Sequence, residues 1–168
     1  MMNDEIDIRN GAPEDYERVI AVMPAWWDGR DMRAMILKLF FVHFADTVFI
    51  AERGGELAGF LIGFLSQRYP DMGYIHFAGV HPELRRRGLA RALCERFYER
   101  CREQGRLVVR SCTSPWNRDS IAFHLRMGCT VEPGDGEADG FPVTLDYHRK
   151  GDPKIVFRKE LQSGRNIV

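Results

Sequence analysis

The sequence of 168 residues lacks the features that identify several classes of protein. Its 24 basic and 24 acidic residues cancel, so no net charge draws the chain toward nucleic acid or a membrane surface. The longest apolar stretch, residues 60–65, is far too short to span a bilayer. Residues 1–5 are polar and acidic, unlike the start of a signal peptide. We therefore expect a cytoplasmic protein with no nucleic-acid partner and no membrane partner.

Metal-binding and nucleotide-binding motifs are absent as well. The four cysteines, Cys94, Cys101, Cys112 and Cys129, form no C-x-x-C pair and have no histidine at zinc-finger spacing, so we expect reduced thiols and no bound metal. Neither a Walker A loop nor a Rossmann fingerprint occurs. No repeat, low-complexity tract or linker divides the chain, so we expect a single domain over residues 1–168.

Hydrophobic periodicity predicts a protein that mixes strands and helices. Strand patterns occupy residues 6–8, 47–52, 57–67, 74–80, 107–112 and 154–161, and helical patterns occupy 13–24, 32–40, 88–104 and 117–127. We expect Pro24 to end the first helix and residues 133–142 to form a long loop between two late strands. This order predicts a mixed sheet with helices on both faces.

The segment FAGVHPELRRRGLARAL, residues 77–93, carries the clearest chemical signal. A strand ends, a short loop follows, and a helix opens at Gly88, where unpaired N–H groups and the helix dipole suit a pyrophosphate. Gly88 and Ala90 are small enough to let a bulky anion approach the backbone. Four guanidinium groups are also available, from Arg85, Arg86, Arg87 and Arg91. Taken alone, the segment predicts a phosphate site, with a solvated arginine cluster or a nucleic-acid patch as alternatives.

Two blocks resemble the GNAT family of N-acetyltransferases. RRRGLA at 85–90 is similar to the family's R/Q-x-x-G-x-G/A signature, and VHP at 80–82 matches its strand-to-loop junction. Residues 117–129 resemble its N-x-x-[SA]-x-x-[FL]-Y-x-x-x-G-F segment. The resemblance covers nearly the whole chain and implies an α/β (α+β) GNAT fold, a mixed sheet of about six to seven strands with about four helices. It also implies an acetyltransferase whose co-substrate is acetyl-CoA.

The resemblance further implies which residues bind acetyl-CoA. The pantetheine arm would pair with the strand backbone at Phe77, Ala78, Gly79 and Val80, and N–H groups there would polarise the thioester carbonyl. The pyrophosphate would lie on the amides of Arg85, Arg86, Arg87, Gly88, Leu89, Ala90 and Arg91. Asn117 and Ser120, at the start of the later helix, would also contact the cofactor. A simple helix cap is the alternative for Asn117.

Catalytic residues follow from the same resemblance. His124 stands where the family most often has Tyr, which can protonate the leaving thiolate, and imidazole can also donate a proton. Tyr74 and His76 share one face of their strand, and His76 resembles the strand histidines of the arylalkylamine acetyltransferases, which relay protons through water. Residues 72–80 contain no Asp or Glu. We therefore expect His124 as general acid and His76, beside Tyr74, in amine deprotonation, with packing roles or proton release to solvent as alternatives.

The acceptor is an amine in this interpretation. The acidic residues of loop 132–140, with Asp28 and Asp31, would favour a cationic amine, although a solvated loop is the alternative. A pocket wall could come from the aromatic side chains of Trp26, Trp27, Phe40, Phe41 and Phe44, which could equally be core. Cys112 is assigned no nucleophilic role, because direct transfer is the family norm.

We expect direct attack by a primary amine of a small molecule in a ternary complex. Acetylation of a protein N-terminus or lysine is an alternative within the enzyme class. A non-catalytic acyl-CoA sensor is an alternative from another class. A homodimer is left open, because dimers are common in this family and no feature of the sequence proves one.

Overall fold

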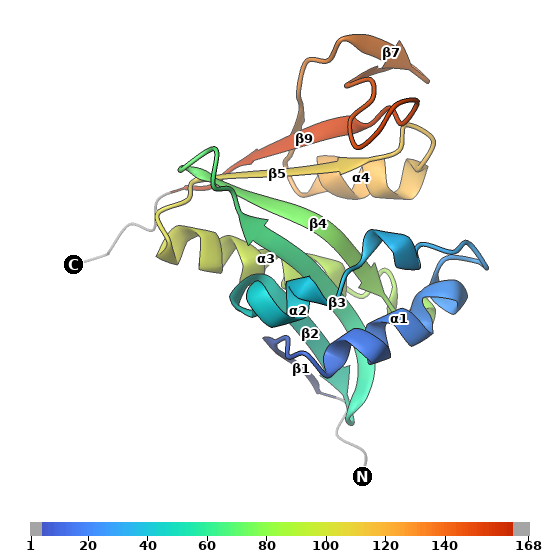
Figure 1. The fold of residues 1–168 in the computed structure, drawn as a ribbon, viewed down its shortest axis with the longest axis vertical. Coiled ribbons are helices and arrows are strands. Elements are labelled where there is room, and N and C mark those ends of the chain that lie inside the picture. The colour runs from blue at the N-terminus through green and yellow to red at the C-terminus, as the bar shows by residue number, and fades with distance from the viewer. Residues whose placement is uncertain (1–4, 163–168) are drawn as a thin grey trace.

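The computed structural model describes residues 5–162 and contains a seven-stranded sheet in the order β1-β2-β3-β4-β5-β9-β6, beside a separate β7-β8 hairpin (Figure 1). The strands are β1 (Ile6–Asn10), β2 (Val48–Arg53), β3 (Glu56–Leu65), β4 (Met72–Val80), β5 (Val108–Thr113), β6 (Thr130–Val131), β7 (Gly136–Ala138), β8 (Phe141–Val143) and β9 (Ile155–Glu160). Strands β4 and β5 pair in parallel, and the other neighbours in the large sheet are antiparallel. The predicted mixed sheet is confirmed.

Helices cover both faces of this sheet (Figure 1). They are α1 (Asp15–Trp26), α2 (Leu39–His43), α3 (Leu89–Glu103) and α4 (Arg118–Arg126), with short 3-10 turns η1 (Arg33–Met35), η2 (Ala45–Thr47) and η3 (Pro82–Leu84). Helices α1 and α2 bury Met23 and Phe41 against Phe60 on one face. On the other face α3 buries Phe97 in a second cluster that also contains Phe157. Each face of the sheet therefore has its own core.

The predicted helix over 32–40 is wrong. Residues Arg33–Met35 form only the turn η1, Ile36 is extended, and α2 begins at Leu39. The side chain of Ile36 is 1% exposed in the α1/α2 core, so burial of this residue overrides the helical spacing.

Pro24 does not end the first helix, because α1 continues to Trp26 with Pro24 inside it. Proline has no backbone N–H, so α1 lacks the hydrogen bond that residue 24 would otherwise donate to the carbonyl of Ile20, and the helix ends two residues later. Asp28 and Gly29, at φ 53° and 80°, then turn the chain.

The predicted loop 133–142 contains the hairpin β7-β8. Asp139 and Gly140 join its strands with φ of 53° and 80°. An Asp-Gly pair with positive φ at both positions is typical of a type I′ turn, so the sequence did carry a signal for this hairpin. The remaining predicted strands and helices are confirmed near their expected positions.

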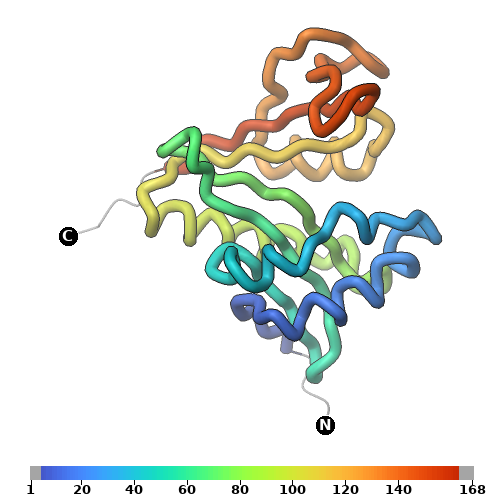
Figure 2. The backbone as a smooth tube through the Cα atoms, viewed as in Figure 1, coloured from blue at the N-terminus to red at the C-terminus, as the bar shows by residue number. Residues whose placement is uncertain are grey.

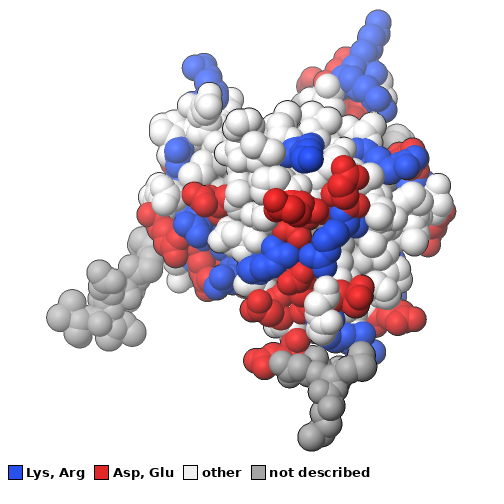
Figure 3. All heavy atoms as spheres, turned by 60° about the horizontal axis from the view of Figure 1, so that its bottom comes forward, with Lys and Arg blue, Asp and Glu red and all other residues white. Residues whose placement is uncertain are grey.

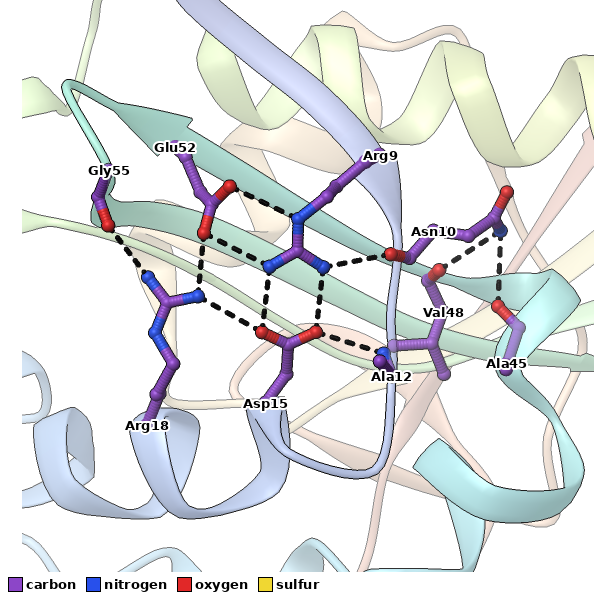
Figure 4. Close-up of polar contacts among 9 residues, drawn as sticks. All are labelled: Arg9, Asn10, Ala12, Asp15, Arg18, Ala45, Val48, Glu52 and Gly55. Carbon is purple, nitrogen blue, oxygen red and sulfur yellow. Dashed lines mark hydrogen bonds and ion pairs between the residues drawn. The ribbon is translucent and has the colours of Figure 1, made fainter.

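An ion-pair network joins β1, α1 and β2 (Figure 4). The Arg9 guanidinium donates to both carboxylate oxygens of Asp15, at 2.7 and 2.9 Å, and to Glu52 at 3.0 and 3.1 Å. Arg18 donates to Asp15 at 3.0 Å, to Glu52 at 2.6 Å and to the Gly55 carbonyl at 3.0 Å. Burial raises the pKa of Asp15, but the hydrogen bonds it accepts outweigh burial and hold that pKa below its ordinary value. The network therefore fixes the start of α1 to the sheet.

Charges of both signs are interspersed on the face shown in Figure 3, with no large area of one sign. Among the helices within residues 5–162, none has the length and apolar character needed to cross a bilayer. The four cysteines are unpaired thiols, and Cys112 is the least buried of them.

Candidate active site

The large sheet opens between β4 and β5. The two strands pair only where Met72, Gly73 and Tyr74 face Val108–Arg110, and they separate beyond that point (Figures 1 and 2). Ala78 is consequently exposed although it lies in a strand well inside the sheet order. A strand edge without a neighbour presents backbone groups that an extended ligand can bind.

Strand β4 directs the backbone groups of Ala78 and Val80 into this gap. The N–H of His81 donates to the Ala58 carbonyl of the β3 side at 2.9 Å. Backbone groups of an antiparallel strand alternate between its two neighbours, so Ala78 and Val80 face away from β3. The Val80 carbonyl accepts from Arg85 Nε at 3.3 Å, which agrees with this direction. The Ala78 amide is therefore available in the gap.

Phe77 and Gly79 brace β4 from the opposite side. The ring of Phe77 packs on Trp27 at 5.2 Å and on Phe60 at 6.3 Å between centroids. Gly79 is buried, and a Cβ at this position would collide with Trp27 and Phe60. The Phe77 ring and the bare backbone of Gly79 thus pack against these aromatic rings, while the backbone edge of β4 beside the gap stays free.

Helix α3 opens beside the end of β4. Gly88 precedes its first residue with φ 85°, and open space surrounds the position where a Cβ would lie. The first N–H groups of a helix have no partner within it, which leaves those of Leu89, Ala90 and Arg91 available. A cavity of about 330 Å³ adjoins this turn and reaches Phe123 of α4. An anion at this place would meet both free donors and the positive end of the helix dipole.

The predicted arginines divide into two groups. Arg86, Arg87 and Arg91 are exposed around the start of α3. Arg85 instead donates to the Trp26 carbonyl at 2.5 Å as well as to Val80, so its side chain ties the end of α1 to β4. A long ligand that contains a pyrophosphate fits the free edge of β4, the open turn at Gly88 and the exposed guanidinium groups. Acetyl-CoA is such a ligand.

His124 lies on α4 with its ring stacked on Phe157, at 4.3 Å between centroids. Its Nδ1 is 2.7 Å from the carbonyl of Ser120. A carbonyl can only accept, so the proton of the neutral ring lies on Nδ1 and Nε2 carries none. Burial lowers the pKa of His124, so the neutral ring is favoured at rest. Asn117 Oδ1 accepts from the Ser120 N–H at 3.1 Å, which is the predicted cap of α4.

His76 is the extra residue of a β-bulge, because its neighbours Phe77 and Ile75 pair with adjacent residues of β3. Its Nε2 is 2.6 Å from the Met35 carbonyl and therefore donates, which leaves Nδ1 as an acceptor. The ring stacks on Phe40 at 4.9 Å. The last residue of η1 thus supplies the carbonyl that orients His76.

Tyr74 joins a polar cluster that the sequence did not predict. Its hydroxyl donates to Cys112 Sγ at 3.5 Å and accepts from the Tyr147 hydroxyl at 3.1 Å. His148 Nε2 is 3.7 Å from the same sulfur. Tyr147 and His148 belong to the segment between β8 and β9, far from β4 in the sequence, and no motif marks them. Burial raises the pKa of Tyr74 far above its ordinary value, so its hydroxyl keeps its proton.

The predicted acceptor acids mostly make contacts within the protein. The contacts join Glu132 to Arg110, Asp135 to the Leu145 N–H, Asp139 to Arg118 and Asp31 to Arg33. Trp26 and Phe41 are core residues, and Trp27 and Phe40 pack against that core. Within residues 5–162 no group of His, Cys, Asp or Glu side chains is placed to hold a metal ion.

Comparison with known proteins identifies a family whose sequence model matches this chain. The sequence model of the acetyltransferase (GNAT) family matches residues 8–129. An L-2,4-diaminobutyric acid acetyltransferase of Nocardia farcinica is 34% identical over 80 residues, which is 48% of this chain and 42% of that enzyme, so the chain spans under half of its length. An acetyltransferase of Photorhabdus laumondii is 28% identical over 163 residues, covering 93% of this chain and 96% of its own.

A solved structure shares the fold. It is the diaminobutyrate acetyltransferase of Paenibacillus lautus in complex with L-2,4-diaminobutyric acid and coenzyme A. The TM-score is 0.65 at 24% identity, and the match covers 92% of this chain and 95% of that one. At this sequence identity the likeness shows a shared fold and nothing further.

Proposed function

The chain belongs to the acetyltransferase (GNAT) family and is an acetyl-CoA-dependent N-acetyltransferase, and we propose that its acceptor is a primary amine of a small molecule. Acetyl-CoA supplies an acyl thioester, and the amine would attack it directly while both substrates are bound. The gap between β4 and β5 and the open first turn of α3 would hold the co-substrate.

Three protein groups would act on the reacting atoms. The Ala78 N–H, which faces the gap, would donate to the thioester carbonyl oxygen as negative charge develops there. His76, with Nδ1 free to accept, would take the proton of the amine through water beside the Tyr74 hydroxyl. The attacking nitrogen still carries an extra proton after it has bonded to the carbonyl carbon. His124 Nε2, which has no proton because the ring proton lies on Nδ1 toward Ser120, would accept that proton and pass it to the leaving thiolate. The remaining predicted cofactor residues would bind the pantetheine arm and the pyrophosphate.

A small acceptor is supported by the two segments that are anchored to β4, the observation on which the proposal depends. On one side the segment after α1 is tied to His76 through the Met35 carbonyl. On the other side the segment before β9 is tied to Tyr74 through the Tyr147 hydroxyl. An acceptor that reaches β4 between these anchored segments would be a compact molecule more readily than an extended peptide. The similarity to enzymes named for diaminobutyric acid adds support for a small amine.

The proposal is tested by measuring release of the coenzyme A thiol with a panel of acceptors. The panel contains L-2,4-diaminobutyric acid, polyamines, single amino acids, peptides with free N-termini and lysine-rich peptides. We expect turnover with at least one small amine and little with peptides. Turnover with peptides alone would make the chain a protein acetyltransferase. Binding of acetyl-CoA without release for any acceptor would favour the sensor alternative.

A further inference from the structure

We propose that Cys112, His148 and Asp152 form a second acyl-accepting site, in which the Cys112 thiol takes the acetyl group of acetyl-CoA when no amine is bound. The substrate class is an acyl thioester, and the product is an S-acetylated enzyme. This inference rests on the proposed placement of acetyl-CoA in the gap between β4 and β5.

The three side chains lie in the order that activates a nucleophile. Cys112 Sγ is 3.7 Å from His148 Nε2, and His148 Nδ1 is 3.5 Å from Asp152 Oδ2. Asp152 in turn forms an ion pair with Lys154, which also donates to Ser114 Oγ at 3.3 Å. A nucleophile beside a base, with the base oriented by a third group, is the arrangement found in covalent catalysis on many unrelated folds. Such contacts are often long in the absence of substrate and shorten in its complex.

The protonation states agree with base-assisted attack. Burial raises the pKa of the Cys112 thiol, against the hydrogen bond from Tyr74, so the resting group is a thiol that needs a base. Burial and the Lys154 charge lower the pKa of His148, so its imidazole is neutral and can accept a proton. Asp152 beside Nδ1 places the ring proton there and leaves Nε2 facing the sulfur.

The loop that carries His148 is held closed by its own backbone. The Tyr147 N–H donates to the Asp152 carbonyl at 3.1 Å. Thr144 and Lys154 exchange backbone hydrogen bonds at 2.9 and 3.1 Å. His148 and Asp152 are therefore presented on a closed turn, which limits how far either side chain can drift from Cys112.

Cys112 also lies at the right place along the sheet. Arg110 is the last residue of β5 that pairs with β4, and Cys112 follows two positions later, where β5 borders the gap. The hydroxyl of Tyr74, the last β4 residue in that pairing, reaches its sulfur from the other side. Cys112 thus lies beside the start of the gap in which the thioester would lie, and it keeps part of its surface exposed.

The proposed step balances without any other reactant. The Cys112 sulfur bonds to the acetyl carbonyl carbon as its proton passes to His148 Nε2. The carbonyl bond to the coenzyme A sulfur then breaks, and the His148 imidazolium returns the proton to the leaving thiolate. One thioester replaces another, so the exchange is close to neutral in free energy and an excess of acetyl-CoA drives it forward. The acetyl group can then return to coenzyme A by the reverse of the same step.

The test needs only acetyl-CoA and no acceptor. The full chain is incubated with excess acetyl-CoA, and mass spectrometry of the intact protein and its peptides locates any added acetyl group. Neutral hydroxylamine distinguishes a thioester, which it cleaves, from an amide. We expect a hydroxylamine-sensitive acetyl group on Cys112, absent from Cys112→Ala, with the buried Cys94, Cys101 and Cys129 unlabelled as internal controls.

Variants of the base decide whether the protein catalyses the exchange. His148→Gln should slow labelling about a hundredfold or more, the scale of general-base assistance, and Asp152→Asn should slow it to a smaller extent. His43→Gln, at an exposed histidine of α2, is the matched control and should label at the wild-type rate. Calorimetric titration with acetyl-CoA verifies that each variant is folded and binds its co-substrate.

Three other results would each contradict the acyl-accepting site, and they can be told apart. Absence of labelling in a protein that binds acetyl-CoA would refute the acyl-accepting site and leave the proposed function intact. Equal labelling in His148→Gln, or equal labelling of all thiols, would mean uncatalysed exchange. Failure to bind acetyl-CoA at all would refute this site and the proposed cofactor site together.

Discussion

His124 stands where the family motif most often has Tyr, and its ring is held in a form that has no proton on Nε2. Its ring stacks on Phe157, and its Nδ1 proton is directed at the Ser120 carbonyl. The motif in the sequence located this residue correctly on α4. The motif could not reveal the tautomer, because the hydrogen bond depends on the helix geometry around Ser120.

The lowered pKa of His124 has a consequence for stability. As the pH falls below the unfolded value, near 6.5, the unfolded chain binds a proton that the folded chain resists, so the free energy of unfolding should decrease. The contribution is present above that pH and is lost on acidification. His124→Gln should reduce this pH dependence when denaturant unfolding is measured from about pH 7 to about pH 5.

His148, whose pKa burial also lowers, titrates in the same direction in both proteins, so the difference between them isolates His124. An unchanged pH dependence in the variant would contradict the assignment of a buried, neutral ring.

The sequence could not predict that the side chains of Cys112, Tyr147 and His148 lie close together. Each belongs to a residue type that performs chemistry, but they are separated along the chain and carry no shared motif. Pairing of β9 beside β5 places the segment that precedes β9 over Cys112. Only that tertiary arrangement brings the three side chains together.

Strand β4 is the element on which the proposed catalysis depends most. Its N–H at Ala78 faces the gap and takes no part in pairing with β3. Ala78→Pro should therefore remove a transition-state donor without breaking a ladder hydrogen bond. We expect kcat to fall roughly 10²- to 10³-fold in the coenzyme A release assay, while the thermal midpoint stays close to that of the wild type.

Ala78→Ser, which keeps the amide, is the matched control and should retain activity. Wild-type activity in Ala78→Pro would remove the amide from the mechanism.

The network at the start of α1 is a structural element with a separate prediction. Asp15 is 3% exposed and accepts from Arg9 and Arg18, so Asp15→Asn leaves Glu52 as the only carboxylate of the network to balance both guanidinium groups. We expect a loss of about 2 kcal/mol in the free energy of unfolding, below that of fully buried pairs because both arginines keep about a third of their surface exposed.

The matched control for Asp15→Asn is Asp31→Asn, in an exposed pair with Arg33, which should leave urea denaturation unchanged. Equal effects of the two changes would show that the network contributes no more than a surface ion pair.

Elements differ in how well periodicity predicted them. Helix α3 was predicted closely, because it has a wide apolar face and a terminal glycine, Gly105, at φ 69°. The segment over 32–40 has a similar spacing but divides at Ile36, whose burial requires an extended backbone. Local periodicity carries no information on where the core lies, so it could not predict this break in the helix.

At the scale of the whole molecule, the proposed acyl transfer and the proposed pyrophosphate binding lie in different regions of the sheet. Its α1/α2 face and the segment before β9 surround Tyr74, His76 and Cys112, where the acyl group would be transferred. The start of α3 at the end of β4 would hold the pyrophosphate. The gap between β4 and β5 connects the two regions (Figure 1). The family signature predicted the start of α3 for the pyrophosphate, and this stays a prediction, whereas only the structure shows that the segment before β9 contacts Tyr74.

The placement of acetyl-CoA in this gap is tested most directly by calorimetric titration of the wild type, Gly88→Ala and Gly88→Glu. Both variants introduce a side chain at φ 85°, and only Gly88→Glu adds a negative charge beside the free N–H groups of α3. We expect saturable binding to the wild type, weaker binding to Gly88→Ala and none to Gly88→Glu. Equal affinity of all three proteins for acetyl-CoA would contradict a cofactor site at the start of α3.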